Sequence, residues 1–156
     1  MQRKNCNYIF VFLMITFVSC KNNIHEDYHT FKDGLWNTEE PITFKYHISD
    51  TAKKYDLSLK IRYLVDYEFQ NLIVFLNGIK KDTFEIFLKD ELGKPTGIGV
   101  SDVREIEYFF DKERVFSKSG DYKIIIEQYM RHGSLARIEN LTNILAIGLI
   151  VSEHND

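Results

Sequence analysis

The segment FQNLIVFLNGIKKDTFEIFL, residues 69–88, decides the fold class of this 156-residue chain. Its first eight residues are mostly apolar, and a strand that is apolar on both faces is typical of the middle of a sheet. Asn77-Gly78 is a strong turn signal, and the residues after it alternate between polar and apolar side chains. Residues 68–89 therefore predict a β-hairpin with its loop near residues 77–82.

Strand patterns continue on both sides of this hairpin. Residues 144–151 (ILAIGLIV) are apolar throughout, which indicates a buried strand that closes the fold. Residues 90–105 contain three of the eight glycines and one of the two prolines, so they predict a long irregular connection. Further strands are predicted over residues 42–48, 57–63, 106–110 (extended by 114–116) and 122–130.

The chain lacks a long stretch with a 3.6-residue apolar period. Leu135, Ile138 and Leu141 predict one helical turn on a connection, and no more than that. Seven or eight short strands separated by turn signals predict an all-β protein, with a single antiparallel β-sandwich of Ig-like or jelly-roll type over residues 35–156.

The first twenty residues have the organisation of an export signal. Arg3 and Lys4 precede an uncharged, mostly apolar run from Tyr8 to Val18, and Ser19-Cys20 follows. The run is about half of the roughly 20 residues that a membrane-spanning helix needs, so a lasting transmembrane anchor is not expected. The alternatives left open are an ordinary cleaved signal with a nearby cysteine, or a short uncleaved membrane helix.

Phe17-Val18-Ser19-Cys20 resembles a bacterial lipobox, although Phe17 stands where leucine is usual. The resemblance implies cleavage of residues 1–19 and acylation of Cys20. Two or three acyl chains hold a protein stably at a membrane, whereas one chain holds it only marginally. Apart from these covalent chains, no cofactor is expected.

Composition excludes several classes of site. After cleavage the chain carries 18 basic and 23 acidic residues, a net charge of −5, which argues against nucleic-acid binding. Cys6 leaves with the signal and Cys20 is acylated, so disulfides, thiolate metal sites and a cysteine nucleophile are all excluded. Residues 20–34 comprise the lipidated cysteine and a polar tether, which reaches roughly 45 Å when fully extended.

The sequence contains no pattern that favours a catalytic or metal-binding site. His25 and His29 are four residues apart, but they bind one metal only on a helical face, which a polar tether does not supply. Gly97-Ile98-Gly99 lacks the third glycine and the helix of a phosphate loop, so a turn or bulge is favoured. The G-x-S-x-G motif of hydrolases does not occur. We therefore predict no catalytic residues, no metal site and no enzyme.

Aromatic residues are the better binding candidates. Tyr108, Phe109 and Phe110 are consecutive on a predicted strand, so at least one ring lies on each face. Together with Trp36, the outward rings are candidates for an exposed patch that contacts a glycan or a partner protein, although burial of both faces is favoured. The alternative is that neighbouring loops cover both faces.

The order of features along the mature chain resembles the GldH gliding-motility lipoprotein family of the Bacteroidota. Its most specific part is Phe116 to Arg131, in which Gln128, Met130 and Arg131 match a Gln-Ala-Met-Arg signature with Tyr129 at the alanine position. The other matching features are Cys20, His25-Glu26-Asp27-Tyr28, Trp36, Pro41-Ile42-Thr43-Phe44, Asp50-Thr51-Ala52, Tyr55-Asp56-Leu57, Ile61-Arg62-Tyr63, Asp66-Tyr67, Asn71-Leu72, Gly97-Ile98-Gly99, Asp102 and Gly148.

The resemblance implies a non-enzymatic lipoprotein required for gliding motility, whose machinery overlaps the type IX secretion system. The expected partners are outer-membrane lipid, reached through the anchor, and other proteins of that machinery. Lys21-Asn22-Asn23 carries neither a surface-export signal nor an inner-membrane retention signal, so an outer-membrane location facing the periplasm is expected. The alternative function is a lipid-tethered carbohydrate-binding β-sandwich.

Three further positions are candidate sites. Gln128 and Arg131 are possible contacts to a partner or glycan, but a structural role is favoured, with Arg131 paired to Asp102 or Glu127. Asp50-Thr51-Ala52 resembles the sequence at which Bacteroidota O-glycosylate exported proteins, which implies modification of Thr51. The alternative for this tripeptide is a plain surface turn.

Overall fold

The computed structural model describes residues 23–134 and 136–155 of the chain, and all structural statements refer to these residues. They form ten strands and one short 3₁₀ turn, η2 (Lys32–Gly34). None of the helical segments in this part of the chain is long and apolar enough to cross a membrane. The strands are β1 (Asn23–Thr30), β2 (Trp36–Asn37), β3 (Ile42–Ile48), β4 (Lys54–Leu64), β5 (Asn71–Asn77), β6 (Lys81–Phe87), β7 (Val103–Val115), β8 (Gly120–Gln128), β9 (Asn140–Leu141) and β10 (Ile144–Glu153).

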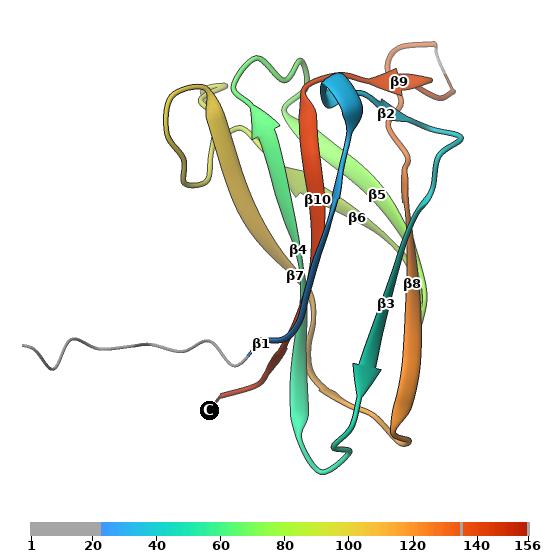
Figure 1. Ribbon diagram of the computed structural model, residues 1–156. Helices are drawn as coiled ribbons and strands as arrows, with labels where there is room; N and C mark the ends of the chain where they lie inside the picture. Colours follow the sequence, from blue (N-terminus) through green and yellow to red (C-terminus); the bar gives the residue numbers. More distant parts are fainter. Residues whose placement is uncertain (1–22, 135, 156) are drawn as a thin grey trace, which may run out of the picture.

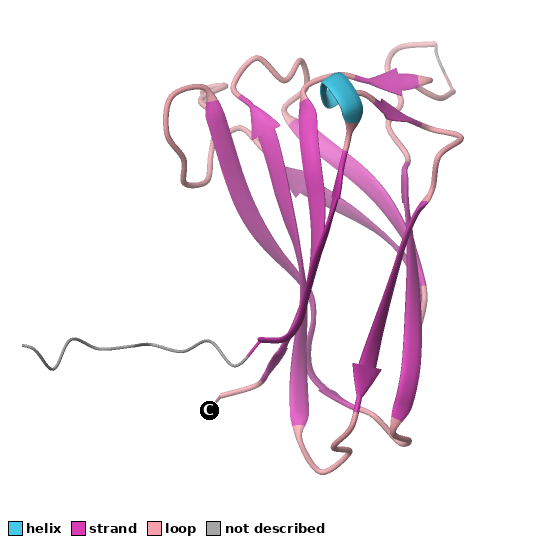
Figure 2. Cartoon of the chain, viewed as in Figure 1, coloured by secondary structure: helices cyan, strands magenta, loops and turns pink. Residues whose placement is uncertain are grey.

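The strands make two four-stranded sheets that pack face to face (Figures 1 and 2). One sheet has the order β1-β10-β4-β7 and the other β3-β8-β5-β6, while β2 and β9 pair separately at one end. Every pairing between these strands is antiparallel. The prediction of an all-β protein built as an antiparallel β-sandwich is therefore confirmed.

The core lies between the sheets and follows the period of two in the sequence. In β3, Ile42, Phe44, Tyr46 and Ile48 are buried, whereas the residues between them are exposed. At one end of the sandwich the fully buried Trp36 ring stacks on Phe31, with ring centroids 5.0 Å apart. Large aromatic side chains thus close the core where the two main sheets end.

Strands that are apolar on both faces occupy interior positions, as predicted. β5 lies between β8 and β6, and β10 lies between β1 and β4. The predicted strands over residues 106–110 and 114–116 belong to one 13-residue strand, β7, except that Phe116 lies just past its end. The ladder between β4 and β7 shifts register near Leu57, and Glu113 has a φ of 54°, so a bulge lets this strand continue past the irregularity.

The predicted helical turn over residues 135–141 is wrong for the part that the structure describes. Ile138 donates its backbone N–H to the Met130 carbonyl, and Leu141 pairs with Trp36 in the β2–β9 ladder. Leu141 is buried by this pairing. Tertiary contacts therefore bury these apolar residues while the chain remains extended, and the three-residue spacing is not a helical repeat here.

The predicted tether is also corrected by the structure. Residues 23–30 form β1, which pairs with β10 over nearly its whole length, and Phe31 is buried in the core. A polar sequence suits this strand because β1 lies at the edge of its sheet and depends on backbone hydrogen bonds more than on apolar burial. The folded domain thus includes residues 23–34, while the predicted signal and Cys20 lie outside the described residues.

This correction shortens the distance between the predicted anchor and the domain. Cys20 and Asn23 are separated by three Cα–Cα steps of 3.8 Å, which span at most about 11 Å. A lipid on Cys20 would therefore hold β1 close to the membrane surface, instead of at the end of a roughly 45 Å tether.

The connection between β6 and β7 is long, as predicted, but it is held by hydrogen bonds. Ile98 pairs with Glu105, each donating its N–H to the other's carbonyl, at 3.0 and 2.8 Å. At Gly97, where φ is +83°, a Cβ atom would lie 2.3 Å from the Glu105 carbonyl oxygen. Gly97-Ile98-Gly99 is therefore a strand-like pairing segment that needs glycine for close backbone approach.

We expect Gly97→Ala to destabilise the protein much more than Gly93→Ala. Both glycines have positive φ, but the space around a Cβ at Gly93 is open to 4 Å. The shared backbone strain is of the order of 1–2 kcal/mol, and the clash at Gly97 adds about 1–3 kcal/mol. Chemical denaturation of the two variants measures this difference, and equal losses of stability would contradict the described packing.

Candidate functional site

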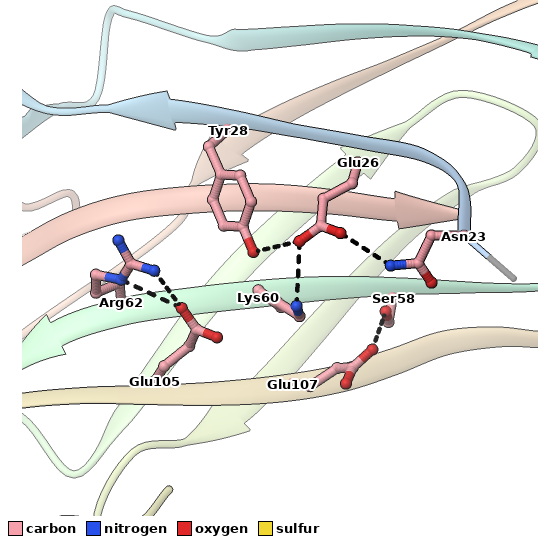
Figure 3. A network of polar contacts seen from close by, with 8 residues as sticks. All are labelled: Asn23, Glu26, Tyr28, Ser58, Lys60, Arg62, Glu105 and Glu107. Carbon is pink, nitrogen blue, oxygen red and sulfur yellow. Dashed lines mark hydrogen bonds and ion pairs between the residues drawn. The ribbon is translucent and has the colours of Figure 1, made fainter. Parts of the chain in front are cut away.

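The outer face of the β1-β10-β4-β7 sheet carries a connected set of polar side chains (Figure 3). Small residues, Ser58 on β4 and Ala146 and Gly148 on β10, lie on this face at the two central strands. Long side chains from β1, β4 and β7 extend over them. We call this set the outer-face network, and it comprises Asn23, Glu26, Tyr28, Ser58, Lys60, Arg62, Glu105 and Glu107.

Glu26 of β1 is the centre of one half of the outer-face network. Its carboxylate accepts hydrogen bonds from Asn23 Nδ2 at 2.9 Å and from the Tyr28 hydroxyl at 3.0 Å. Lys60 Nζ of β4 lies 3.3 Å from the same carboxylate. These contacts cross over β10 and connect the edge strand to the middle of the sheet.

The other half connects β4 to the edge strand β7. Arg62 donates from Nε and Nη2 to one oxygen of Glu105, at 3.2 and 2.7 Å. Ser58 donates to Glu107 at 2.8 Å. The Arg62 guanidinium also lies 5.8 Å from the Tyr28 ring centroid, which joins the two halves by a cation–π contact.

Gly148 determines how Tyr28 lies on the sheet. A Cβ atom at Gly148 would be 2.5 Å from Cε1 of the Tyr28 ring, so only glycine leaves room for the ring above β10. Tyr28 and Gly148 are also direct partners in the β1–β10 ladder. The glycine thus permits the ring to extend across the strand, where its hydroxyl reaches Glu26.

The contacts favour the ionised forms of Glu26 and Lys60. The hydrogen bond from Asn23, followed by those from Tyr28 and Lys60, holds the pKa of Glu26 below its ordinary value. Burial, followed by the hydrogen bond to Glu26, raises the pKa of Tyr28. Burial opposes the charge of Lys60, but hydrogen bonds to Tyr28 and Glu26 raise its pKa overall. An ionised, paired carboxylate is a poor general acid, so the network suits binding more than proton transfer.

The lowered pKa of Glu26 gives a pH-dependent expectation. A carboxyl group whose folded pKa is depressed adds stability above its unfolded pKa, and this stability is lost as pH falls through the folded pKa. We expect wild type to have a higher Tm than Glu26→Gln at pH 7, with the difference shrinking as pH falls below about 4.3, the ordinary pKa of glutamate, and disappearing only below the depressed folded pKa. Thermal unfolding at several pH values measures this, with Glu40→Gln as an exposed control; a Tm difference independent of pH would contradict the ionised network.

The predicted exposed aromatic patch does not exist in the structure. Trp36 is fully buried, and Tyr108 and Phe110 pack toward Phe84 of the opposite sheet, with ring centroids 5.9 and 6.1 Å from it. Phe109 alone points outward, at 38% exposure, and Lys112 Nζ lies 4.7 Å from its ring centroid. The consecutive rings do alternate between faces, but the inward set belongs to the core.

Gln128 and Arg131 have different surroundings. Gln128 is buried, its Nε2 donates to the Ile138 carbonyl at 2.6 Å, and its Oε1 accepts from the Met130 N–H at 3.0 Å. Gln128 therefore holds the chain after β8 and is not available to a partner. Arg131 is exposed and lies over the Tyr129 ring at 5.4 Å, and not in the predicted carboxylate pair with Asp102 or Glu127.

Thr51 is exposed in the turn between β3 and β4. The Asp50 carboxylate accepts the Ala52 N–H at 2.9 Å, which is the hydrogen bond of an Asx turn. A modifying enzyme can reach the Thr51 hydroxyl in this turn, and its O-glycosylation stays a prediction, as does acylation of Cys20.

The histidines of β1 do not share a metal ion. Residues four apart on a strand are separated by about 13 Å, so His25 and His29 cannot bind the same ion. Among the residues that the structure describes, no group of three or more His, Cys, Asp or Glu side chains is placed to hold a metal.

A cavity of about 110 Å³ opens between β6 and the end of β7. Apolar side chains, including Phe84, Phe110 and Ile124, form its wall, and two ion pairs flank it, Lys80 with Asp82 and Arg114 with Asp111. Pockets for small-molecule ligands usually measure about 300–1,000 Å³. This cavity has room for a few waters or one side chain, and not for a substrate of ordinary size.

Sequence reasoning missed the outer-face network as a unit. The polar residues Ser58, Lys60 and Arg62 are visible as the alternate members of a predicted strand. Their partners on β1 belong to the segment predicted as a tether. The His25–Tyr28 segment contains acidic and aromatic residues, but a polar edge strand lacks the apolar alternation that would have revealed it.

Comparison with known proteins gives consistent matches over nearly the whole chain. The family model described as GldH lipoprotein matches residues 23–151, from the first residue of β1 into β10. A protein of Christiangramia forsetii named "Gliding motility lipoprotein GldH homolog" is 31% identical over 96% of both chains. The "Gliding motility lipoprotein GldH" of Flavobacterium johnsoniae is 26% identical over 98% of this chain and 99% of its own.

Among solved structures, a chain from the structure of infectious bursal disease virus Gx strain matches with 12% identity and a TM-score of 0.33. The match covers 86% of this chain and 30% of the viral chain. We draw no conclusion about fold or function from a TM-score this low. The family-model match and the two full-length relatives show that this chain belongs to the GldH lipoprotein family.

Proposed function

We propose that this protein is an outer-membrane lipoprotein that serves gliding motility as a non-enzymatic assembly or stability factor. The observation that carries the proposal is membership in the GldH lipoprotein family over residues 23–151, together with two full-length relatives named for gliding motility. Its partners in this role are other proteins of the gliding and type IX secretion machinery.

The anchor in this proposal is a set of acyl chains on Cys20. The support is the Ser19-Cys20 sequence after a short apolar run, and the start of the folded domain three residues later. The acyl chains place the protein at the outer membrane, with the domain on the periplasmic side. Because the span from Cys20 to Asn23 is at most about 11 Å, the β1 end of the domain stays next to the lipid surface.

A scaffold role fits the polar groups that the structure describes. The carboxylates of Glu26 and Glu105 are paired with cations on an open sheet face, and the cavity beside β6 is too small for most substrates. Fixed, alternating charges give a surface that discriminates between protein partners through charge complementarity.

The alternative, a glycan-binding sandwich, has less support. Sugar binding by stacking needs two or more exposed rings about one sugar apart. Of the four predicted rings, Trp36 is fully buried, Tyr108 and Phe110 pack against Phe84, and only Phe109 is directed to solvent. The scattered and buried rings therefore favour a protein scaffold.

Deletion of the gene in the bacterium that carries it tests the proposal. We expect deletion cells to lose movement over glass and to regain it when the wild-type gene is returned on a plasmid. Export of type IX cargo to the medium is measured in the same cells. Normal gliding together with normal cargo export in the deletion strain would contradict the proposed function.

A further inference from the structure

Three apolar side chains of the β6–β7 connection are directed into solvent. Leu92 is 93% exposed, Ile98 78% and Val100 85%, and these are the three most exposed large apolar side chains in the described chain. Single exposed apolar residues are ordinary on protein surfaces, but interaction sites concentrate such residues, and here the three most exposed ones lie within nine positions of one loop. We call residues 88–102 the apolar loop.

The apolar loop is held in one conformation by its own hydrogen bonds. The Asp90 carboxylate accepts the N–H groups of Leu92 and Lys94, both at 2.9 Å, and the Asp90 N–H donates to the Lys94 carbonyl at 2.9 Å. At the base of the loop, the buried Tyr63 hydroxyl lies 2.5 Å from the Leu88 carbonyl oxygen and 2.7 Å from that of Thr96. A partner therefore meets an ordered surface and does not have to order it on binding.

The second half of the loop is built so that Ile98 and Val100 cannot turn inward. At Gly97 and Gly99, a Cβ atom would lie 2.3 Å from the Glu105 carbonyl oxygen and 2.0 Å from the Val103 carbonyl oxygen. The two glycines therefore pack directly against the backbone at the start of β7. The residues that alternate with them face away from the fold, which accounts for their exposure.

The apolar loop lies at the opposite end of the sheet from the start of β1 (Figure 1). Asn23 pairs with Ser152, which pairs with Asp56 of β4, whereas the start of β7 at Val103 pairs with Leu64. Asp56 and Leu64 are eight positions apart, which corresponds to about 27 Å along the strand. Anchoring at Cys20 therefore leaves the loop well away from the lipid attachment point.

We propose that the apolar loop is a docking element that inserts Leu92, Ile98 and Val100 into an apolar groove of another envelope protein. Residues 88–102 contain two lysines and three carboxylates, a net charge of −1. A net negative charge gives the loop no attraction to anionic lipid headgroups. The loop is also about 27 Å along the strands from the end of the sheet at which β1 begins, so a protein groove is favoured over the lipid that the anchor enters. A basic rim on the groove would complement Glu91 and Asp102.

This inference rests on the proposed function, since it names the kind of partner through which the protein acts. The test uses full-length, acylated protein in its own bacterium, with the photo-reactive amino acid benzoylphenylalanine at position 92. The matched control carries it at position 115, because Val115 is 60% exposed on β7 at the opposite end of the strand from the loop. Ultraviolet light then cross-links the benzoylphenylalanine at each position to the molecule that it contacts.

We expect position 92 to give one protease-sensitive adduct with another protein, whose linked peptide is rich in apolar residues, and position 115 not to give it. Adding Ile98→Asp and Val100→Asp is expected to reduce this adduct at least tenfold and to abolish gliding, whereas Val115→Asp changes neither. The variant with Ile98→Asp and Val100→Asp and the Val115→Asp control must both keep the wild-type Tm, which is expected because all three positions are exposed. An adduct with lipid, an adduct of twice the chain mass, or an adduct insensitive to the two aspartates would overturn the inference.

The two proposals fail in different ways. If wild-type protein restores gliding but position 92 gives no adduct, the docking role of the apolar loop is wrong and the proposed function stands. If deletion cells glide and export cargo normally, the proposed function is wrong whatever position 92 contacts.

Discussion

Replacing Trp36 with alanine is expected to lower the free energy of unfolding by about 3–5 kcal/mol, the largest stability loss that we predict for one side chain. Trp36 is fully buried, stacks on Phe31 at 5.0 Å, and pairs with Leu141 through the short β2–β9 ladder. Truncation leaves a cavity at the end of the core that the two-residue strands cannot fill. Since whole domains are stable by only about 5–15 kcal/mol, such a loss approaches unfolding.

A second substitution separates packing from hydrogen bonding at this position. The buried Trp36 indole nitrogen has no hydrogen-bond partner among the described residues. Trp36→Phe therefore removes an unsatisfied donor and keeps part of the ring stacking, so we expect it to cost clearly less than Trp36→Ala. Chemical denaturation measures both, with Phe87→Ala as the control at a 55% exposed aromatic, where the expected change is within about 0.5 kcal/mol. A Trp36→Ala loss below about 1 kcal/mol would contradict the buried position.

The sequence predicted the interior strands well because their signal is local. β5 and β10 are apolar on both faces, and the structure places each between two neighbours in its sheet. β3 shows strict alternation, and its inward residues form part of the core. In each of these strands the side chains alone reveal the degree of burial, so periodicity is enough.

Strand β1, in contrast, could not be predicted from the periodicity of the sequence. Its residues are largely polar, and its place in the sheet depends on backbone pairing with β10, which leaves no apolar pattern in the sequence. The outer-face network was missed for the same reason, since Glu26 and Tyr28 come from β1 while Lys60 and Arg62 come from β4. Contacts between strands more than thirty residues apart cannot be read from a single sequence.

The aromatic candidates illustrate a second limit. The sequence predicted that Tyr108, Phe109 and Phe110 alternate between faces, and they do. It did not reveal that Tyr108 and Phe110 pack against Phe84 of the opposite sheet. Nor did it reveal that Trp36 is buried at the end of the core. Burial of an aromatic ring depends on which strand faces it, and therefore on topology.

The proposed location depends on acylation of Cys20, because acyl chains on this residue would determine where the domain and its apolar loop lie. Substituting this residue is expected to have the largest effect on location. Each buried methylene of an acyl chain contributes about 0.8 kcal/mol to membrane binding, so two or three chains account for stable attachment.

The measurement that tests this claim most directly is incorporation of radiolabelled palmitate into the protein in its own bacterium, followed by separation of outer membranes from soluble proteins. We compare wild type, Cys20→Ala and Cys6→Ala, the last being a matched control at the other cysteine of the chain. Label and outer-membrane location are expected for wild type and Cys6→Ala, and both are expected to be lost in Cys20→Ala. Unlabelled wild-type protein, or a Cys20→Ala variant that keeps its label, would contradict it.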